Sequence, residues 1–437
     1  MYRDKINELI QWKKAKDRKP LIIRGARQVG KTWLMKEFGK TEYEDVIYVN
    51  FEQEQTLKDM FKGDLYPEKL LKMLEMHFKI KPQPEKTLIV FDEIQEAERG
   101  LTSLKYFCED APEYHIIAAG SLLGVTLHKN VSFPVGKVNF LDLQPLTFLE
   151  FLSAMGEERF ADLLKEKNIS LITTFKERYI EWLRYYFYIG GMPEVVANFA
   201  ENRDFSQVRK IQQFILDTYE KDLSKHAPKD IIGRIELLWN SIPSQLAKEN
   251  RKFVYANIAP GARAREYELA MAWLLDCGLI HKIHRVTKAG YPLKAYHDFS
   301  AFKLYLNDIG LMSAMVKMET KVLLEGSAVF EEFKGALTEQ YVLQQLITNN
   351  DLVITYWSAE RSDAEIDLLI QHESQIIPIE IKAAENLRAK SLKSFCEKFH
   401  PSTAIRTSMS DYREETWLTN VPLYAIGNYF LKMKSQT

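Results

Sequence analysis

The sequence predicts an α/β protein that begins with a mostly parallel sheet, continues with helices and a hairpin, and ends in a second α/β segment. Up to about Thr147, short apolar runs alternate with segments of helical spacing, which is typical of a parallel sheet covered on both faces. Beyond that point helical spacing dominates, and a basic hairpin follows it. Near the C-terminus, two strands with alternating charged and apolar residues bring back the α/β pattern.

Strands are expected where apolar residues run together and end at small or acidic residues. These runs are "PLIIRG" (20–25), "DVIYVNFE" (45–52), "KTLIVFDEIQ" (86–95) and "YHIIAAGS" (114–121). Helices are expected at 1–19, 31–40, 66–78 and 101–110, and Pro67 is placed to start the third of them. Uniformly apolar strands favour a buried parallel sheet.

The rest of the chain is expected to form further domains. The expected boundaries are 1–150 for the N-terminal domain, 151–204 for a helical lid or connector, 205–322 for a middle domain and 323–437 for a C-terminal domain. Gly190, Gly191 and Pro193 end the long aromatic helix of the lid, and its run "WLRYYFYIGG" favours a core over a base-stacking platform. Helices followed by a hairpin that turns near Gly290 suggest a winged-helix-like middle domain.

The C-terminal segment begins with a long helix at 331–348. Strands are expected at 364–371 and 375–384, a helix at 389–399 and a last strand at 421–427.

Composition sets the broad class of the protein. The chain has 437 residues, of which 46% are hydrophobic and 27% charged, as in an ordinary globular protein. The net charge of −1 favours neither nucleic acid nor a membrane as partner. Cys108, Cys277 and Cys396 form no C-x-x-C pair, which argues against a zinc ribbon or disulfide scaffold and fits a cytoplasmic location. The N-terminus lacks the apolar core of a signal peptide, and no apolar run approaches a membrane span.

The stretch "GARQVGKT" is the first that carries chemistry, because it matches G-x-x-x-x-G-K-[ST] between an apolar strand and a helix. Its glycines let the backbone approach phosphate oxygens, and the amides of the loop and of the helix N-terminus point at the anion. The residues expected to bind a nucleotide are Gly25, Ala26, Arg27, Gln28, Val29, Gly30, Lys31 and Thr32. The alternative is a glycine turn that binds nothing.

Four residues have expected roles around that nucleotide. Lys31 would reach the β and γ phosphates, and the Thr32 hydroxyl would bind Mg²⁺. Asp92, which ends the strand of "LIVFDEIQ" and is expected to lie beside the loop, would hold the Mg²⁺ through water. Glu93 would orient the water that attacks the γ-phosphate. Adjacent acids are common at strand ends, so Asp92 and Glu93 indicate a nucleotide site only in combination with the phosphate loop upstream.

Two further parts of the site stay open at this stage. "HIIAAGS" ends at Gly120 and Ser121, and a polar residue there is expected to contact the γ-phosphate, with a simple strand-to-loop turn as the alternative. The arginine that would complete the site has three candidates, Arg159, Arg178 and Arg184, which solvated helix charges explain equally well.

A second constellation lies in "EIDLLIQHESQIIPIEIKAAE". Residues two apart on a strand share a face, so Glu380 and Lys382 point together, and a hairpin would bring Asp367 beside Glu380. Two adjacent carboxylates repel unless a cation lies between them, and Mg²⁺ there would activate water against a phosphodiester while Lys382 stabilises the developing charge. The alternative is an amphipathic hairpin with a solvated polar face.

The spacing D-x(12)-E-x-K resembles that of the PD-(D/E)XK nuclease superfamily, and the order helix, strand, strand, helix agrees with a restriction-endonuclease-like fold. Glu339 in the preceding helix resembles the acid that some members add to the metal site. The resemblance implies a metal site at Asp367, Glu380 and Glu339. Nuclease activity does not follow from it, since relatives of this fold often lose activity.

Nearly the whole chain resembles a family of prokaryotic AAA-type ATPases with an N-terminal P-loop domain and a C-terminal domain of unknown function. The matching stretches, in family order, are "RGARQVGKT", "VNFE", "LIVFDEIQ", "AAGSLLG", "YIGGMPEVV", "IPSQLAKEN", "FKLYLNDIGLM" and "EIDLLI…IPIEIKA". The resemblance implies a P-loop NTPase sheet, ATP and Mg²⁺ as ligands, ATP hydrolysis, a winged-helix-like middle and a nuclease-like end. One departure is Ala119, where relatives more often carry a threonine.

The leading hypothesis is a Mg²⁺-dependent ATPase that couples its nucleotide state to a nuclease-like, DNA-handling C-terminal domain. The alternative is an ATP-dependent switch or protein-interaction module with an inactive nuclease fold. A nucleotide kinase is disfavoured because no acceptor-binding signature follows the loop. The basic stretches "KENRK", "RAREYE" and "HKIHRVTK" suit a DNA backbone and a solvated surface equally well. A homo-oligomer stays open, and no membrane partner is expected.

Overall fold

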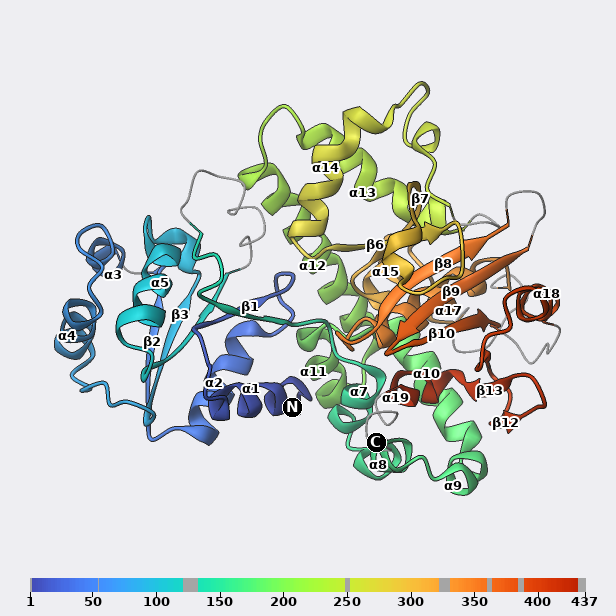
Figure 1. Ribbon diagram of the computed structural model, residues 1–437, viewed down its shortest axis with the longest axis horizontal. Coiled ribbons are helices and arrows are strands. Elements are labelled where there is room, and N and C mark those ends of the chain that lie inside the picture. The colour runs from blue at the N-terminus through green and yellow to red at the C-terminus, as the bar shows by residue number, and fades with distance from the viewer. Residues whose placement is uncertain are drawn as a thin grey trace. The chain divides into compact units, whose positions relative to one another are not determined.

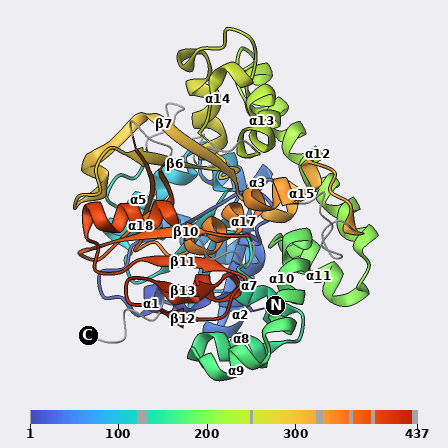
Figure 2. The same cartoon turned by 90° about the vertical axis from the view of Figure 1, so that its right-hand side faces the viewer.

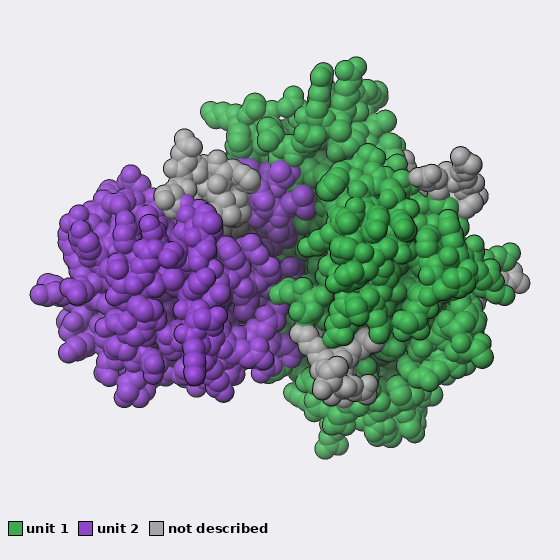
Figure 3. Space-filling model, viewed as in Figure 1, with its two compact units in different colours: residues 1–2, 145–271, 280–437 green, residues 3–144, 272–279 purple. Residues whose placement is uncertain are grey.

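The computed structural model describes residues 2–53, 55–120, 133–247, 252–321, 331–359, 364–383 and 389–430. The chain divides into two compact units (Figure 3). Unit 2 contains residues 3–144 and 272–279, and unit 1 contains residues 1–2, 145–271 and 280–437. Apart from residues 272–279, the three segments expected after the N-terminal domain share unit 1. Their identities as a lid, a winged-helix-like domain and a nuclease-like domain stay predictions.

Unit 2 is built on a five-stranded parallel sheet with the order β2-β3-β4-β1-β5 (Figure 1). Its strands are β1 (Leu21–Arg24), β2 (Asp45–Asn50), β3 (Thr87–Asp92), β4 (His115–Ala119) and β5 (Asn139–Asp142). Every residue of β3 and β4 is buried, because both faces of a parallel sheet are covered. The parallel α/β fold expected of the N-terminal part is confirmed. β5 was not expected, because its sequence, NFLD, is too short and too polar to indicate a strand.

Besides residues 272–276, which end a later helix, five α-helices and one short 3-10 turn accompany this sheet within the described part of unit 2. They are α1 (Lys5–Lys14), α2 (Lys31–Glu42), α3 (Gln55–Met60), α4 (Pro67–Phe78), α5 (Gly100–Asp110) and the 3-10 turn Ile94–Glu96. Pro67 lies in the first turn of α4, as expected. Phe51, Phe61 and Phe91 are fully buried and meet edge-on or tilted in the core.

Between residues 148 and 246 the helices follow one another with no strand in between, and the described chain after residue 145 contains many helices. They are α7 (Phe148–Ala154), α8 (Glu158–Glu166), α9 (Ile169–Thr174), α10 (Lys176–Ile189), α11 (Pro193–Asn202), α12 (Phe205–His226), α13 (Ile232–Leu246), α14 (Ala264–Asp276), α15 (Ile309–Met315), α17 (Glu331–Leu346), α18 (Lys390–Phe399) and α19 (Ile426–Tyr429). The aromatic run of α10 is core, since Trp182, Tyr186, Phe187 and Tyr188 are all buried. In the described ranges, none of the helices combines the length and the apolar character needed to span a bilayer.

Unit 1 contains an eight-stranded mixed sheet with the order β12-β13-β11-β10-β9-β8-β6-β7 (Figure 1). Its strands are β6 (Ile280–Val286), β7 (His297–Leu306), β8 (Val353–Ser358), β9 (Glu365–His372), β10 (Gln375–Ile381), β11 (Ile405–Ser408), β12 (Arg413–Glu414) and β13 (Thr419–Pro422). The expected hairpin is present as antiparallel β6 and β7. Because β6 also pairs with β8, the expected boundary at 322/323 runs through one continuous sheet.

The end of the chain differs from expectation. The expected elements α17, β9, β10 and α18 are present in that order, but an unexpected strand, β8, lies between α17 and β9. The strand expected at 421–427 is wrong over most of its length. β13 ends at Pro422, and the 3-10 turn Leu423–Ala425 and α19 follow it. Proline has no backbone N–H to donate to a neighbouring strand, so the ladder stops there. The other 3-10 turns of the described chain are Tyr255–Asn257 and Leu293–Tyr296.

Two glycine-containing motifs of unit 1, "YIGGMPEVV" and "LNDIGLM", meet at the buried carboxylate of Asp308. Asp308 caps α15 by accepting from the Leu311 amide at 3.0 Å, and its other oxygen accepts from the Gly191 amide at 2.6 Å and from Gln344 Nε2 at 3.1 Å. A Cβ at Gly190, whose φ is +75°, would lie 2.2 Å from Asp308 Oδ1. The glycines therefore let α10 approach the cap of α15 closely, and Gln344 ties α17 to the same point.

We expect Asp308→Ala to lower the free energy of unfolding of unit 1 by about 3 kcal/mol, because it removes a helix cap and leaves buried amides without an acceptor. Chemical denaturation followed by circular dichroism measures this change. Asp204→Ala is the matched control, since Asp204 caps α12 through the Ser206 amide at 2.7 Å but is only half-buried. The free energy of unfolding of Asp204→Ala should fall by about 1 kcal/mol. Equal small losses in both variants would contradict the role of Asp308.

Candidate functional site

The predicted phosphate loop joins β1 to α2. Gly30 is the N-cap of α2 with φ +94°, and Gly25 has φ +144°. A Cβ at Gly25 would lie 2.2 Å from the carbonyl oxygen of Leu143, so no other residue fits there without displacing the backbone. Gln28 also adopts positive φ, at +63°. The loop therefore has the tight, glycine-dependent turn that the motif predicted, and it opens directly into the helix N-terminus.

Lys31 lies inside this loop. Its side chain is 7% exposed, and Nζ donates to the carbonyl oxygens of Gly25 at 2.9 Å and Ala26 at 2.8 Å. Burial lowers the pKa of Lys31 to about 8, although the nearby carboxylates of Glu93 and Asp92 oppose the shift. A buried ammonium that donates to main-chain carbonyls is well placed to exchange them for an anion.

Asp92 ends β3 and is 3% exposed. Its Oδ2 accepts from Thr32 Oγ1 at 2.8 Å, and its Oδ1 accepts from the Glu93 amide at 3.1 Å. The two expected magnesium-binding residues are thus in contact, even though β4 lies between β1 and β3 in the sheet. Tyr48 of β2 also donates to Asp92 Oδ2, at 2.6 Å, and sequence reasoning missed this contact. The strand "DVIYVN" carried the only hint, because it places a hydroxyl among apolar residues.

Glu93 follows Asp92 in an unusual backbone conformation. Its φ of +50° and ψ of +45° are left-handed, which is uncommon for a residue with a Cβ. Its Oε2 accepts from Gln95 Nε2 at 2.6 Å, a second partner that the sequence did not reveal. Left-handed non-glycine residues concentrate at functional sites, where the surrounding structure holds the strain.

Residues 272–279 are the part of unit 2 that is distant in sequence from the rest. Gly278 has φ +70°, and a Cβ at this position would lie 3.0 Å from the Ala26 amide nitrogen and 3.4 Å from the carbonyl carbon of Gly25. A glycine is required for this approach. The backbone at Gly278 therefore packs on the start of the phosphate loop.

The remaining residues expected around the nucleotide are only partly placed. β4 ends at Ala119, and Ser121 lies outside the described residues, so its contact with a γ-phosphate stays a prediction. Arg159, Arg178 and Arg184 belong to unit 1. Arg178 makes ion pairs of 2.7 Å with Glu157 and Glu181, which favours its interpretation as a helix charge.

The second constellation lies on β9 and β10. These strands are antiparallel with Ile379 opposite Leu368, so the next position places Glu380 beside Asp367 as the hairpin predicted. Glu380 Oε1 pairs with Lys382 Nζ at 2.7 Å, and Asp367 Oδ2 accepts from the Ile381 amide at 2.7 Å. Burial raises the pKa of Glu380, Asp367 adds to the rise, and Lys382 and Arg406 oppose it.

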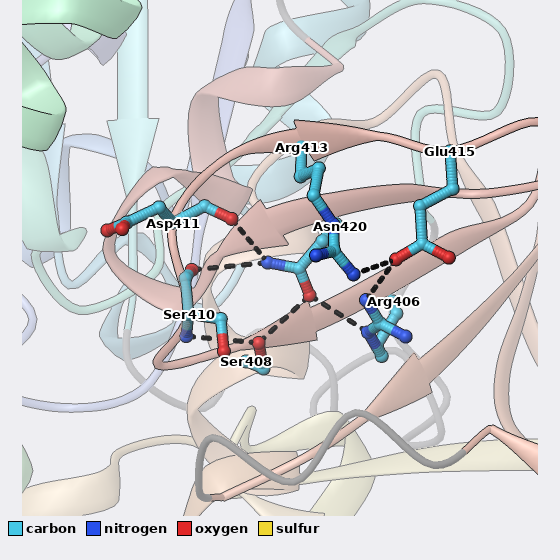
Figure 4. Close-up of polar contacts among 7 residues, drawn as sticks. All are labelled: Arg406, Ser408, Ser410, Asp411, Arg413, Glu415 and Asn420. Carbon is cyan, nitrogen blue, oxygen red and sulfur yellow. Dashed lines mark hydrogen bonds and ion pairs between the residues drawn. The ribbon is translucent and has the colours of Figure 1, made fainter.

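Arg406 was not identified from the sequence. It lies on β11 directly opposite Glu380, and Figure 2 shows β10, β11, β13 and β12 following one another across the sheet. Arg406 is 2% exposed and donates to Asn420 Oδ1 and Glu415 Oε1, each at 3.0 Å (Figure 4). Arg413 contacts the same oxygen of Glu415. Glu380 therefore has a fixed cation on its neighbouring strand in addition to Lys382.

Glu339 of α17 is held in a different cluster. It pairs with Lys303 Nζ at 3.0 Å and accepts from the hydroxyl of Tyr305, and Lys303 also pairs with Glu365 at 2.6 Å. Lys303 and Glu339 are completely buried. In the ranges that the structure describes, no three His, Cys, Asp or Glu side chains are grouped so that they could hold a metal ion. The metal-binding roles of Asp367, Glu380 and Glu339 stay predictions.

Family models match three separate parts of the chain. Residues 17–152 match an AAA domain, residues 180–322 match a domain of unknown function (DUF8612), and residues 334–426 match another domain of unknown function (DUF4143). The first match covers the phosphate loop, all five strands of the parallel sheet and Asp92, and it supports an AAA-type P-loop domain in this part of the chain.

Solved structures with detectable likeness include three proteins of low identity. A Walker-type ATPase of Pyrococcus abyssi is 14% identical, with 72% of this chain and 95% of that chain covered and a TM-score of 0.45. The Orc1 protein of Aeropyrum pernix in complex with DNA is 12% identical (73% and 93% covered, TM-score 0.29), and Cdc6p from Pyrobaculum aerophilum is 10% identical (70% and 88% covered, TM-score 0.24). TM-scores of this size carry no argument about function. Among curated proteins, no sequence matches this chain.

The surroundings of Glu380 generate a pH prediction. Because its pKa is raised in the folded state, its stabilising contribution is present below the ordinary carboxyl pKa and is lost as the pH rises through the folded-state pKa. Glu380→Gln removes this loss. We therefore expect the melting temperature of Glu380→Gln, relative to wild type, to rise from about pH 4 to about pH 7.

Glu415→Gln is the control of opposite sign. The hydrogen bond from Arg413 lowers the pKa of Glu415, so its contribution is present above the ordinary carboxyl pKa and is lost in acid. The relative melting temperature of Glu415→Gln should fall over the same pH range. Thermal unfolding scans measure both variants. Relative melting temperatures that change with pH in the same direction would contradict the opposite pKa shifts of Glu380 and Glu415.

Proposed function

We propose that unit 2 binds ATP with Mg²⁺ and hydrolyses it. The observation that carries this proposal is the hydrogen bond of 2.8 Å between Thr32 Oγ1 and Asp92 Oδ2, close to the buried Lys31. It joins the first turn of α2 to the end of β3. A hydroxyl and a carboxylate beside a phosphate loop are the pair that holds Mg²⁺ in P-loop NTPases. The match of residues 17–152 to an AAA domain supports the same proposal.

The residues present fit a phosphate chain and its metal ion. Gly25 and Gly30 both have positive φ, which lets the backbone turn tightly into the N-terminus of α2, where amides can face an anion. Phosphate oxygens would replace the carbonyls of Gly25 and Ala26 as partners of Lys31. Thr32 and Asp92 would hold Mg²⁺, which neutralises charge on the phosphates when bound.

The chain's own groups then have distinct tasks. Lys31 stabilises negative charge on the terminal phosphate. Glu93, held by Gln95 in a fixed position, orients a water molecule and accepts its proton. Asp92 is fixed by donors on both of its oxygens and does not need to move.

A pair of substitutions separates binding from turnover. We expect Lys31→Ala to weaken ATP binding on the order of 100-fold or more, because it removes the cation of the loop. Glu93→Gln should keep ATP binding and lower kcat on the order of 100-fold or more, because it removes the base. Titration calorimetry and a phosphate-release assay measure the two effects.

Glu96→Gln is the matched control for the second substitution. Glu96 is a nearby glutamate that pairs with Lys58 at 3.7 Å. Its turnover should equal that of the wild type. Normal turnover in Glu93→Gln would contradict a catalytic role for Glu93. Unchanged binding of Mg²⁺-ATP to Lys31→Ala would contradict the assignment of the phosphate loop as the nucleotide site.

The pKa of Lys31 makes ATP binding depend on pH. With a pKa of about 8 in the free protein, Lys31 is charged below that pH and loses its proton above it. Phosphate stabilises the charged form, so affinity is fully present below about pH 8 and falls as the pH rises through it, with proton uptake on binding. Calorimetry at about pH 8.5 in two buffers of different ionisation enthalpy measures that uptake. An equal binding enthalpy in the two buffers would contradict proton uptake by Lys31.

A DNA-handling role for the C-terminal part is a second candidate, favoured by the side-by-side placement of Asp367 and Glu380 with Lys382 paired to Glu380. In the competing candidate, a nucleotide-dependent switch, these groups serve only as a polar surface of an inactive fold. Incubation with single- and double-stranded DNA and Mg²⁺ or Mn²⁺ separates the two. Cleavage that disappears in Asp367→Ala and Glu380→Ala supports DNA handling, whereas intact, unretained DNA under every condition supports the switch.

A further inference from the structure

Tyr48 of β2 contacts the proposed nucleotide site through Asp92. Its hydroxyl donates to Asp92 Oδ2 at 2.6 Å, the same oxygen that accepts from Thr32 at 2.8 Å. We propose that Tyr48 is a positioning residue for magnesium, because it holds the Asp92 carboxylate in the orientation that the metal requires. This inference rests on the proposed function and deepens it.

The strand register explains why Tyr48 has this position. β2 is the edge strand next to β3, and Tyr48 is opposite Val90, two residues before Asp92. Residues two apart share a strand face, so the two side chains project from the same side of the sheet. Asn50 is directly opposite Asp92, but its side-chain oxygen accepts from the Glu52 amide at 2.9 Å. The longer phenol of Tyr48 is therefore the group of β2 that bonds to the carboxylate.

The hydrogen bonds of Asp92 show what Tyr48 contributes. Oδ1 has the Glu93 amide as donor, and Oδ2 has Thr32 and Tyr48. When the Thr32 hydroxyl turns to a metal ion, Tyr48 remains as the donor on Oδ2. Asp92 is 3% exposed, so water is not available to replace a lost donor. With Tyr48 in place, each oxygen of Asp92 would keep one donor when Thr32 binds a metal ion.

The tyrosine is itself held in place. Lys36 Nζ lies 4.2 Å from the centre of the Tyr48 ring, and Lys36 follows Thr32 by one turn on the same face of α2. A phenol hydroxyl is protonated at neutral pH, so Tyr48 acts as the donor in its hydrogen bond to Asp92. α2, β2 and β3 are joined at this one point.

Tyr48→Phe removes the hydroxyl and keeps the ring. We expect Mn²⁺ to bind on the order of tenfold more weakly in the presence of ADP, as is usual when a group that orients a metal ligand is lost. The loss of the free Mn²⁺ signal in electron paramagnetic resonance measures this affinity directly. The Mg²⁺ concentration for half-maximal ATP hydrolysis should rise by a similar factor, while ADP binding without metal and kcat at saturating Mg²⁺ stay near wild type.

Tyr43→Phe is the matched control. The Tyr43 hydroxyl contacts His115 Nδ1 at 2.7 Å and no group of the site, so the same chemical change should leave Mn²⁺ affinity unaltered. Wild-type Mn²⁺ affinity in folded Tyr48→Phe, or an equal loss in both variants, overturns the inference. Should Tyr48→Phe not fold, Lys36→Ala must give a smaller shift of the same sign or the inference fails. A wild-type protein that binds Mn²⁺-ADP without hydrolysing ATP refutes only the proposed ATPase, because the Mn²⁺ comparison still stands.

Discussion

The buried carboxylate of Asp92 is the point on which the candidate site depends. It ends an interior strand where little water reaches it, so its charge is tolerable only because three donors surround it. Those donors come from the helix after the phosphate loop, from the edge strand and from the next residue along the chain. The carboxylate thus connects α2 and β2 to the end of β3. Lys31 lies inside the phosphate loop and donates to the carbonyl oxygens of Gly25 and Ala26.

Unit 1 uses the same principle in its own interior. Lys303 has two carboxylate partners, Glu339 and Glu365, and Asp308 accepts from amides that start or follow helices. A buried charge is costly unless every partner is in place, so these groups specify one packing arrangement of α10, α15 and α17. Glu380 and Arg406, which lie opposite each other on the neighbouring strands β10 and β11, are a further case of opposite charges placed side by side. Polar contacts of this kind explain why the motifs around Gly190 and Asp308 contain the residues they do.

The sequence predicted the loop at Gly25–Thr32, Asp92 and the parallel sheet because each depends on a local pattern. A glycine spacing, an apolar run and a strand-ending acid are all visible within a few residues. Tyr48, Arg406 and the partners of Glu339 were not predictable, since each acquires its role from a residue on another strand or helix. The same reason explains the missed strand β5, which is short and polar and is defined by pairing with β1. The mistaken strand at 421–427 shows the reverse case, in which an apolar run continued past the proline that ends the ladder.

The packing of Gly278 on the phosphate loop has a consequence for dissecting the molecule. Unit 2 is assembled from two pieces of chain, and the shorter piece, 272–279, is encoded far downstream of the longer one. A fragment that stops near residue 150 would lack part of its own folding unit and would leave the backbone of Gly25 and Ala26 uncovered. Instability or weak nucleotide binding of such a fragment would then reflect the missing 272–279 segment, not a defect of the phosphate loop itself. The smallest fragment that retains the whole of unit 2 must contain both residues 3–144 and residues 272–279.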